Sequence, residues 1–110
     1  MPIHIYPMKW IYLIKAELEG KEYYKIGITT RLPEKRLKEL QTGNALKLEL
    51  VMTFRTRFGN LFEGTLHRTF SLEKETGEWF SLNTEQVRGF LDTCQTIENN
   101  FKLIQEHKNS

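Results

Sequence analysis

The chain has 110 residues, of which 39% are hydrophobic and 27% charged. This size and composition suit one globular domain and are too small for a protein of two or more domains. A single cysteine, Cys94, excludes an intramolecular disulfide, and no apolar run approaches the ~20 residues that cross a membrane. Residues 1–68 hold 12 Lys and Arg against 7 Glu, a balance that fits either an ordinary solvated surface or an anionic partner such as nucleic acid. Because residues 1–4 also lack the basic start of a targeting segment, we expect a cytoplasmic protein that does not bind membranes.

The first predicted elements are two strands. An aromatic and β-branched run over residues 9–17 predicts a buried strand, and a similar run over 23–29 predicts a second strand that pairs with it as a β-hairpin. With a hairpin loop over 17–20, Tyr12 would lie opposite Lys25. Both side chains would then project from the same face of the sheet, because side chains alternate along each strand.

The middle of the chain predicts two helices and two further strands. Proline and leucine spacing predicts a helix over 32–41, and alternating apolar residues predict a third strand over 46–54. Apolar residues at helical spacing predict a second helix over 59–70. Residues 71–77 are expected to form a loop, and residues 78–82 a short strand.

A last helix is predicted to begin after Asn83, because Asn83 followed three residues later by Gln86 is typical of a capping box. Its apolar face continues for about five turns. The residues of this face are Val87, Phe90, Leu91, Cys94, Ile97, Phe101 and Ile104. The order β-β-α-β-α-β-α predicts an α/β protein, in the broad sense that includes α+β folds, with a single domain over 1–110.

Five polar residues on four of these elements could carry chemistry: Tyr12, Lys25, Arg36, Glu63 and His67. Taken singly, each also fits a structural role as a core aromatic, an edge cation, a surface arginine or a helix-surface pair. Together they are sufficient for phosphodiester hydrolysis. A glutamate can hold a magnesium ion, an arginine can pair with the phosphate, and a tyrosine or histidine can relay the proton of the attacking water.

The order of short motifs along the chain resembles that of the GIY-YIG nuclease superfamily. The motifs are Trp10-Ile11-Tyr12, Lys25-Ile26-Gly27, Arg36-Leu37, Glu63-x-x-x-His67 and Gly77-Glu78-Trp79-Phe80. They are most similar to the small phage and bacterial branch, in which the second motif reads Lys-Ile-Gly and the late motif Glu-Trp-Phe. The resemblance implies a three-stranded antiparallel sheet flanked by helices over 9–82, with a C-terminal helix and tail over 83–110 outside it.

The resemblance also implies roles for residues of the first three motifs. Tyr12 would activate or position the attacking water, and Lys25 would hold the water or the tyrosine oxygen and favour a tyrosinate. Gly27 would allow close backbone approach beneath the phosphate. Arg36 would stabilise charge that develops on the scissile phosphate.

In the fourth motif, the resemblance makes Glu63 the ligand of one divalent metal ion, Mg²⁺ or Mn²⁺, and gives His67 a supporting role beside it. Two positions depart from the superfamily pattern. Trp10 replaces the glycine of the first motif, and Leu40 stands where many members have a histidine.

The leading hypothesis from the sequence is a metal-dependent endonuclease or nickase that acts on DNA with low sequence specificity, since 110 residues leave no room for a separate recognition domain. Its phosphate contacts are expected from Arg31, Lys35, Lys38, Arg55 and Arg57. One alternative, favoured by Leu40, is a catalytically inactive DNA-binding module. A second alternative is a protein-interaction domain that uses the C-terminal helix, through which it would also form a homodimer.

Overall fold

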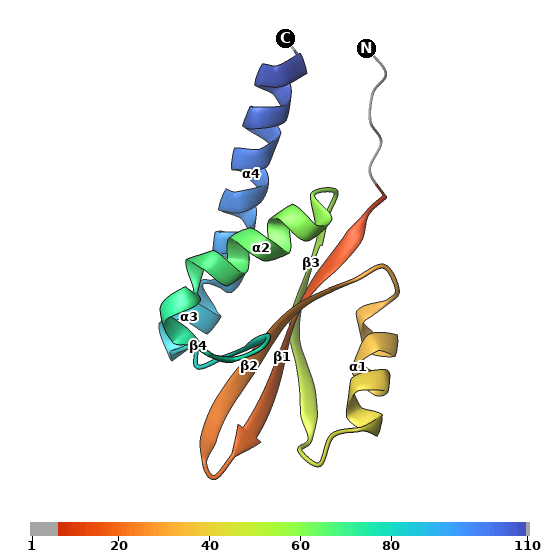
Figure 1. Ribbon diagram of the computed structural model, residues 1–110, viewed down its shortest axis with the longest axis vertical. Coiled ribbons are helices and arrows are strands. Elements are labelled where there is room, and N and C mark those ends of the chain that lie inside the picture. Colours follow the sequence, from red (N-terminus) through yellow and green to blue (C-terminus); the bar gives the residue numbers. More distant parts are fainter. Residues whose placement is uncertain (1–6, 110) are drawn as a thin grey trace.

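An antiparallel sheet with helices packed on both faces forms the fold, as the computed structural model in Figure 1 shows. The structure describes residues 7–109, so the expectation that rests on residues 1–4 lies outside the described residues. The strands are β1 (Lys9–Leu18), β2 (Lys21–Thr29), β3 (Leu48–Thr56), β4 (Lys74–Thr76) and β5 (Trp79–Phe80), in the spatial order β3-β1-β2-β5-β4. The helices are α1 (Pro33–Thr42), α2 (Gly59–Thr69), α3 (Thr84–Arg88) and α4 (Phe90–Asn109), with a short 3-10 turn, η1, over Ser71–Glu73.

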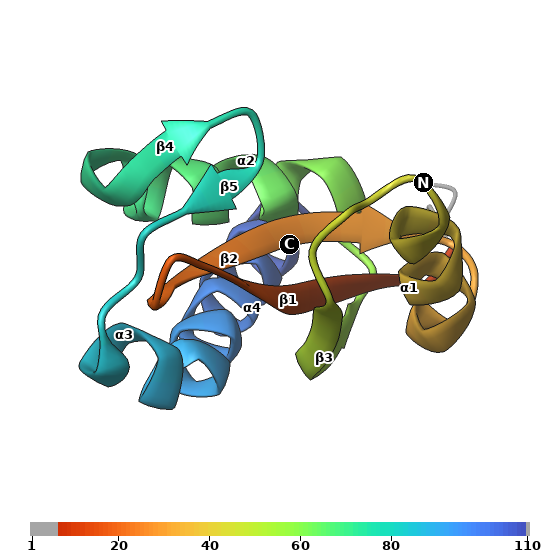
Figure 2. The same ribbon diagram turned by 90° about the horizontal axis from the view of Figure 1, so that it is seen from below.

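The α+β class is confirmed, but the expected number of strands in the sheet is wrong, because the sheet has five strands rather than three. The two additional strands, β5 and β4, extend the sheet beyond β2 as a small hairpin. Figure 2 shows this hairpin beside α2. Strands of three and two residues are too short to display an alternating pattern, which is why the sequence predicted a loop where β4 lies.

The turn between β1 and β2 sets the register of the central hairpin. Leu18 pairs with Lys21, so only Glu19 and Gly20 form the turn, with φ values of 52° and 79°. Two consecutive positive φ values are typical of the tight turns that connect twisted strands. The expected loop of four residues was therefore too long, and Tyr12 lies opposite Gly27 instead of Lys25.

The two faces of β1 contribute to two clusters of apolar side chains. Ile11 and Leu13 lie on the face that packs against α2 and α4, where the larger cluster forms. Tyr12 and Ile14 lie on the opposite face, which leucines of α1 cover. Figure 1 shows α1 on one side of the central strands and α2 and α4 on the other. Because successive side chains of a strand point to opposite faces, alternate residues of β1 face α1, and the residues between them face α2 and α4.

The capping box at Asn83 is confirmed, but the helix that it opens is short. The Asn83 side chain accepts a hydrogen bond from the Gln86 backbone N–H, and the Gln86 side chain accepts one from the Asn83 N–H. Gly89 ends this helix, α3, and a separate helix, α4, begins at Phe90. No helix within residues 7–109 is both long and apolar enough to cross a membrane.

A buried hydrogen bond ties the end of β3 to α4. The Thr56 hydroxyl donates to Glu98 Oε1 at 2.7 Å and accepts from the Phe58 backbone N–H at 3.0 Å. Both Thr56 and Glu98 are buried. Since Phe58 immediately precedes α2, this arrangement fixes the turn that leads from the sheet into α2.

We predict that Thr56→Val lowers the free energy of unfolding by about 1–3 kcal/mol, because it leaves the buried Glu98 carboxylate without its hydroxyl partner. Thr56→Ser keeps the hydroxyl and serves as the control, with a smaller loss. Urea unfolding followed by circular dichroism measures both. Equal stability of Thr56→Val and the wild-type protein would contradict the structural role of this bond.

Candidate active site

The candidate site forms where the edge of β2 becomes free. β5 pairs with β2 only at Tyr24 and Lys25, and the last contact on this edge is the Ile26 N–H donating to the Glu78 carbonyl at 3.1 Å. The carbonyl of Ile26 lies 3.0 Å from His67 Nε2, on α2. The helix α2 therefore lies against the edge of β2 at the point where β5 ends, and its side chains meet those of the loop before β5.

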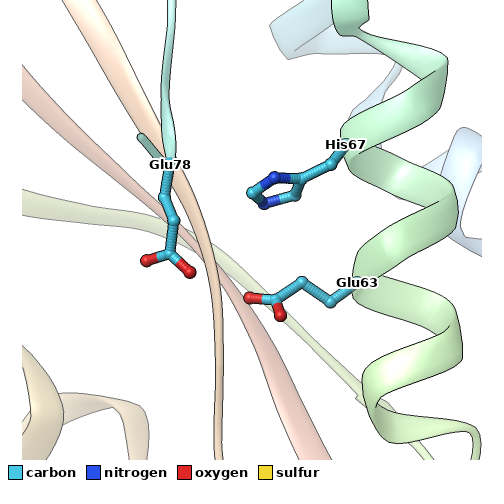
Figure 3. A group of neighbouring side chains, drawn as sticks. All are labelled: Glu63, His67 and Glu78. Carbon is cyan, nitrogen blue, oxygen red and sulfur yellow. The ribbon is translucent and has the colours of Figure 1, made fainter. Parts of the chain in front are cut away.

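Three side chains converge there: Glu63 and His67 from α2 and Glu78 from the residue before β5. One nitrogen or oxygen from each can be chosen so that all three atoms lie within 4.8 Å of one another. Figure 3 shows the carboxylates of Glu63 and Glu78 pointing toward each other, with the imidazole of His67 beside them. The two carboxylates are the donors that Mg²⁺ and Mn²⁺ prefer in proteins, whereas an imidazole nitrogen suits softer metals such as Zn²⁺.

The Glu63 carboxylate lies in an environment that disfavours its negative charge. Its Oε2 is buried and has no hydrogen-bond partner among the described residues. Burial, followed by the neighbouring Glu78 carboxylate, raises the pKa of Glu63, while His67 and Lys25 lower this pKa by a smaller amount. A cation between the two carboxylates would satisfy the unpaired oxygen and relieve their repulsion, so the residues present fit a divalent metal ion.

Lys25 lies beside Glu78. Its Nζ is 2.9 Å from Glu78 Oε1, and the ammonium also lies over the ring of Trp79, 5.6 Å from the centroid. Only 15% of the Lys25 side chain is exposed, so this ion pair is partly shielded from water. The lysine that the sequence placed next to the tyrosine oxygen thus neutralises Glu78 instead.

Charges of both signs act on the Tyr12 hydroxyl. The residue is buried, with 2% of its surface exposed. Burial raises the pKa of Tyr12, a hydrogen bond with Arg36 lowers it, and the charges of Glu78 and Glu63 raise it further. The hydroxyl is therefore protonated at neutral pH in the free protein. Arg36, rather than Lys25, is the cation that favours its ionised form.

The position of Tyr12 depends on the absence of a side chain at Gly27. A Cβ atom at Gly27 would lie 2.2 Å from the Tyr12 hydroxyl oxygen and 2.3 Å from Cζ, far inside van der Waals contact. The sequence assigned Gly27 to close approach of the phosphate. In the structure, Gly27 makes room for the Tyr12 ring, which lies directly across β2.

The residues predicted to contact phosphate lie outside this cluster, on α1 and at the ends of β2 and β3. Lys35, Lys38 and Arg57 are exposed. Arg55 lies over the ring of Trp10, 5.4 Å from its centroid, and Arg31 pairs with Glu39 of α1. Their role in binding nucleic acid stays a prediction.

Sequence reasoning gave no role to Glu78, which the structure places at the centre of the site. The residue was noticed only as part of the segment Gly77-Glu78-Trp79-Phe80. One available signal was the scarcity of other carboxylates, because Asp92 is the only aspartate in the chain and any second acidic ligand had to be a glutamate. Choosing among the glutamates required the pairing of β5 with β2.

The fold and site can be compared with known proteins. The family model of the T5orf172 domain matches residues 9–95, and the chain belongs to this family. The T5orf172 family is often associated with nuclease and DNA-binding activity. No curated protein and no solved structure matched the chain.

The family match corrects the resemblance to the GIY-YIG superfamily that the sequence motifs suggested, because the T5orf172 domain is a different family. The shared short motifs did not identify the family. The roles that this resemblance implied for the site residues therefore need support from geometry and electrostatics alone.

We predict that Gly27→Ala lowers the free energy of unfolding by about 1–3 kcal/mol, because the new methyl group displaces the Tyr12 ring from a close-packed position. Gly43→Ala is the matched control, since a Cβ atom there would meet no atom within 4 Å. Chemical denaturation of the two variants measures the difference. Equal stabilities would show that the ring does not need this space.

The raised pKa of Glu63 predicts a pH-dependent stability. Ionised Glu63 is less favourable in the folded chain than in the unfolded chain, so it costs stability above its raised pKa. The cost disappears as the pH falls below the ordinary value of 4.5, where both states are protonated. Glu63→Gln should therefore raise the free energy of unfolding at neutral pH but not at acidic pH, in metal-free buffer.

Glu106→Gln is the control for this measurement, because Glu106 is exposed on α4. Thermal or chemical unfolding across the pH range compares each variant with the wild-type protein. A stabilisation by Glu63→Gln that is independent of pH would contradict the electrostatic explanation.

Proposed function

We propose that this protein is a metal-dependent endonuclease or nickase that hydrolyses phosphodiester bonds in DNA with low sequence specificity. The observation that carries the proposal is the meeting of Glu63, His67 and Glu78, with the unpaired Glu63 oxygen among them. The charges of Glu78 and Glu63 act on the Tyr12 hydroxyl and raise its pKa, and Arg36 is the hydrogen-bond partner of this hydroxyl. The set combines metal ligands, a phosphate-binding cation and a proton-transferring hydroxyl.

Glu63 and Glu78 would hold a divalent metal ion, Mg²⁺ or Mn²⁺. When bound, such an ion stabilises negative charge on the phosphate and on the leaving oxygen. His67 Nε2 faces the carbonyl of Ile26, which can only accept a hydrogen bond, so this nitrogen carries a hydrogen in either protonation state. In the neutral ring, Nδ1 is then the nitrogen without a hydrogen, and His67 keeps a supporting role beside the two carboxylates.

Arg36 and Tyr12 act on the substrate as a pair in this proposal. The guanidinium of Arg36 is half-buried and can donate two N–H groups to a phosphate. The Tyr12 hydroxyl can orient the attacking water by hydrogen bonding. It could take the proton of this water only as a tyrosinate, after losing its own proton to solvent. Burial, followed by the charges of Glu78 and Glu63, opposes this ionised form, whereas Arg36 and a cation bound to the two carboxylates would favour it. Lys25 holds Glu78 in place through their ion pair.

A catalytically inactive DNA-binding module is the second candidate function. The observation that favours it is the Lys25–Glu78 ion pair, which already neutralises one of the two carboxylates. On the α1 side, Leu40 packs with Tyr12 in an apolar cluster and offers no proton-transfer group. Such a module would bind DNA in a salt-dependent way without cutting it.

An interaction through α4, including a homodimer, also stays a prediction. Its support is the exposure of Leu103 and Ile104 near the end of this helix, at 63% and 52%. Ile104 belongs to the apolar face that the sequence predicted for the last helix, whereas Leu103 lies outside that predicted face.

We predict that the purified protein nicks supercoiled plasmid DNA in Mg²⁺ or Mn²⁺ and that EDTA abolishes nicking. Glu63→Gln should reduce nicking by at least ~100-fold, because it removes the charge of one metal ligand while conserving shape. Agarose gel assays measure the rate, with Glu106→Gln as the control. Full activity of Glu63→Gln would refute the metal site, and DNA binding without any cutting would support the inactive module.

We further predict that Tyr12→Phe lowers the cleavage rate by about 10²-fold or more while leaving DNA affinity unchanged, because it removes a proton-transferring hydroxyl but little volume. The same variant should retain its thermal stability within about 1 kcal/mol, since the lost hydrogen bond is with a partly exposed arginine. A normal rate in Tyr12→Phe would mean that this residue serves only in the apolar cluster.

A further inference from the structure

A second feature lies beside the proposed active site, where β2 ends and the chain turns into α1. It is an open depression of about 290 Å³ lined by Lys9, Ile28, Thr29, Thr30, Arg31 and Arg36. Arg36 belongs to both places, since it lines the depression and also hydrogen-bonds the Tyr12 hydroxyl. Arg36 therefore links the depression to the Tyr12 hydroxyl of the proposed active site.

The walls of the depression carry more positive than negative charge. Both carboxylate oxygens of Glu39 bind Arg31, at 2.5 and 2.8 Å, and one of them also lies 3.2 Å from Arg36. Lys9 has no carboxylate partner in the part of the chain that the structure describes. The three cations of the lining are thus offset by one carboxylate, which contacts only Arg31 and Arg36, and the surplus charge would attract an anion.

The position of Lys9 strengthens this imbalance. A Cβ atom at Gly59, the first residue of α2, would lie 3.6 Å from Lys9 Nζ. The first turn of α2, which lies wholly within the described residues, has no side-chain cap and no acidic residue. An ammonium beside the positive end of a helix is unfavourable unless an anion neutralises both.

The chemistry of the lining favours a phosphate group. The fork of Arg31 binds the two oxygens of the Glu39 carboxylate, and a phosphodiester that displaces Glu39 would present two oxygens in the same geometry. The exposed Thr30 can donate its hydroxyl. Lys9 adds a point charge from the other side of the depression, without a fixed direction.

We propose that this depression binds a backbone phosphate of the DNA strand next to the phosphate that is cleaved. The proposal rests on the proposed function, because the identity of the anion as part of a DNA strand follows from the adjacent site. Lys9, Arg31 and Thr30 position the strand, and Arg36 lies between the two phosphates. Contacts of this kind fix the position of the strand without reading bases.

The test measures DNA binding in EDTA, so that cleavage plays no part. Fluorescence anisotropy with a labelled duplex gives the affinity of the wild-type protein, Lys9→Met and Arg31→Met over a range of salt concentrations. Methionine keeps the length of the aliphatic stem and removes the charge. Lys102→Met is the matched control, because Lys102 is an exposed lysine on α4 and its loss changes the net charge equally.

Loss of one phosphate contact should lower the slope of log affinity against log salt by about 0.7–0.9 in each depression variant and should weaken binding roughly equally for all sequences. Lys102→Met should keep the wild-type slope. If Lys9→Met and Arg31→Met both keep the wild-type salt slope, as the control does, the phosphate subsite is overturned, even if the wild-type protein cuts DNA.

Two further outcomes separate this proposal from the proposed function. Variant-sensitive binding without any metal-dependent nicking would keep the subsite and refute the nuclease. The second outcome comes from calorimetric titration with inorganic phosphate, which measures the affinity of the depression for a free anion. Tight binding of phosphate that depends on Lys9 and Arg31, in a protein that does not bind DNA, would assign the depression to a free anion and overturn its role as a strand contact.

Discussion

The contact between Tyr12 and Gly27 constrains the whole candidate site. The ring of Tyr12 can lie across β2 only because residue 27 lacks a Cβ atom, and the two residues face each other only because a two-residue turn joins β1 to β2. A register shifted by two residues would place Lys25 beneath the ring. The hydroxyl would then be near an ammonium instead of its actual neighbours, Arg36 and the carboxylates of α2 and the β5 loop.

The carboxylates of Glu63 and Glu78 repel each other, and the packing of the rest of the fold holds them in place. Glu63 is held in a partly buried position beside Glu78, with one oxygen unpaired among the described residues, and its pKa is raised as a result. The packing of α2 on the sheet and the buried Thr56–Glu98 bond near its start hold this arrangement together. Unfavourable charge placement that stable packing maintains is typical of functional sites.

The positive charge of the molecule is distributed so as to complement these carboxylates. Lys25 lies on the Glu78 side of the site, while Arg36 connects the Tyr12 hydroxyl to the depression with Lys9 and Arg31. The proposed metal ligands and the proposed phosphate contacts therefore lie side by side but are not mixed. In the proposed function, this separation would give a nucleic-acid strand a direction along the surface, from the depression toward the carboxylates.

The sequence by itself determined the long elements and the capping box at Asn83, because apolar periodicity and capping are local properties. It also named five of the six residues of the candidate site, all except Glu78, from their chemistry. It did not determine the family, since short motifs alone pointed to the wrong one. Tertiary structure decided the role of Gly27, the partner of Lys25 and the importance of Glu78. Each of these depends on strand register or on the pairing of very short strands, which distant contacts fix and local patterns cannot show.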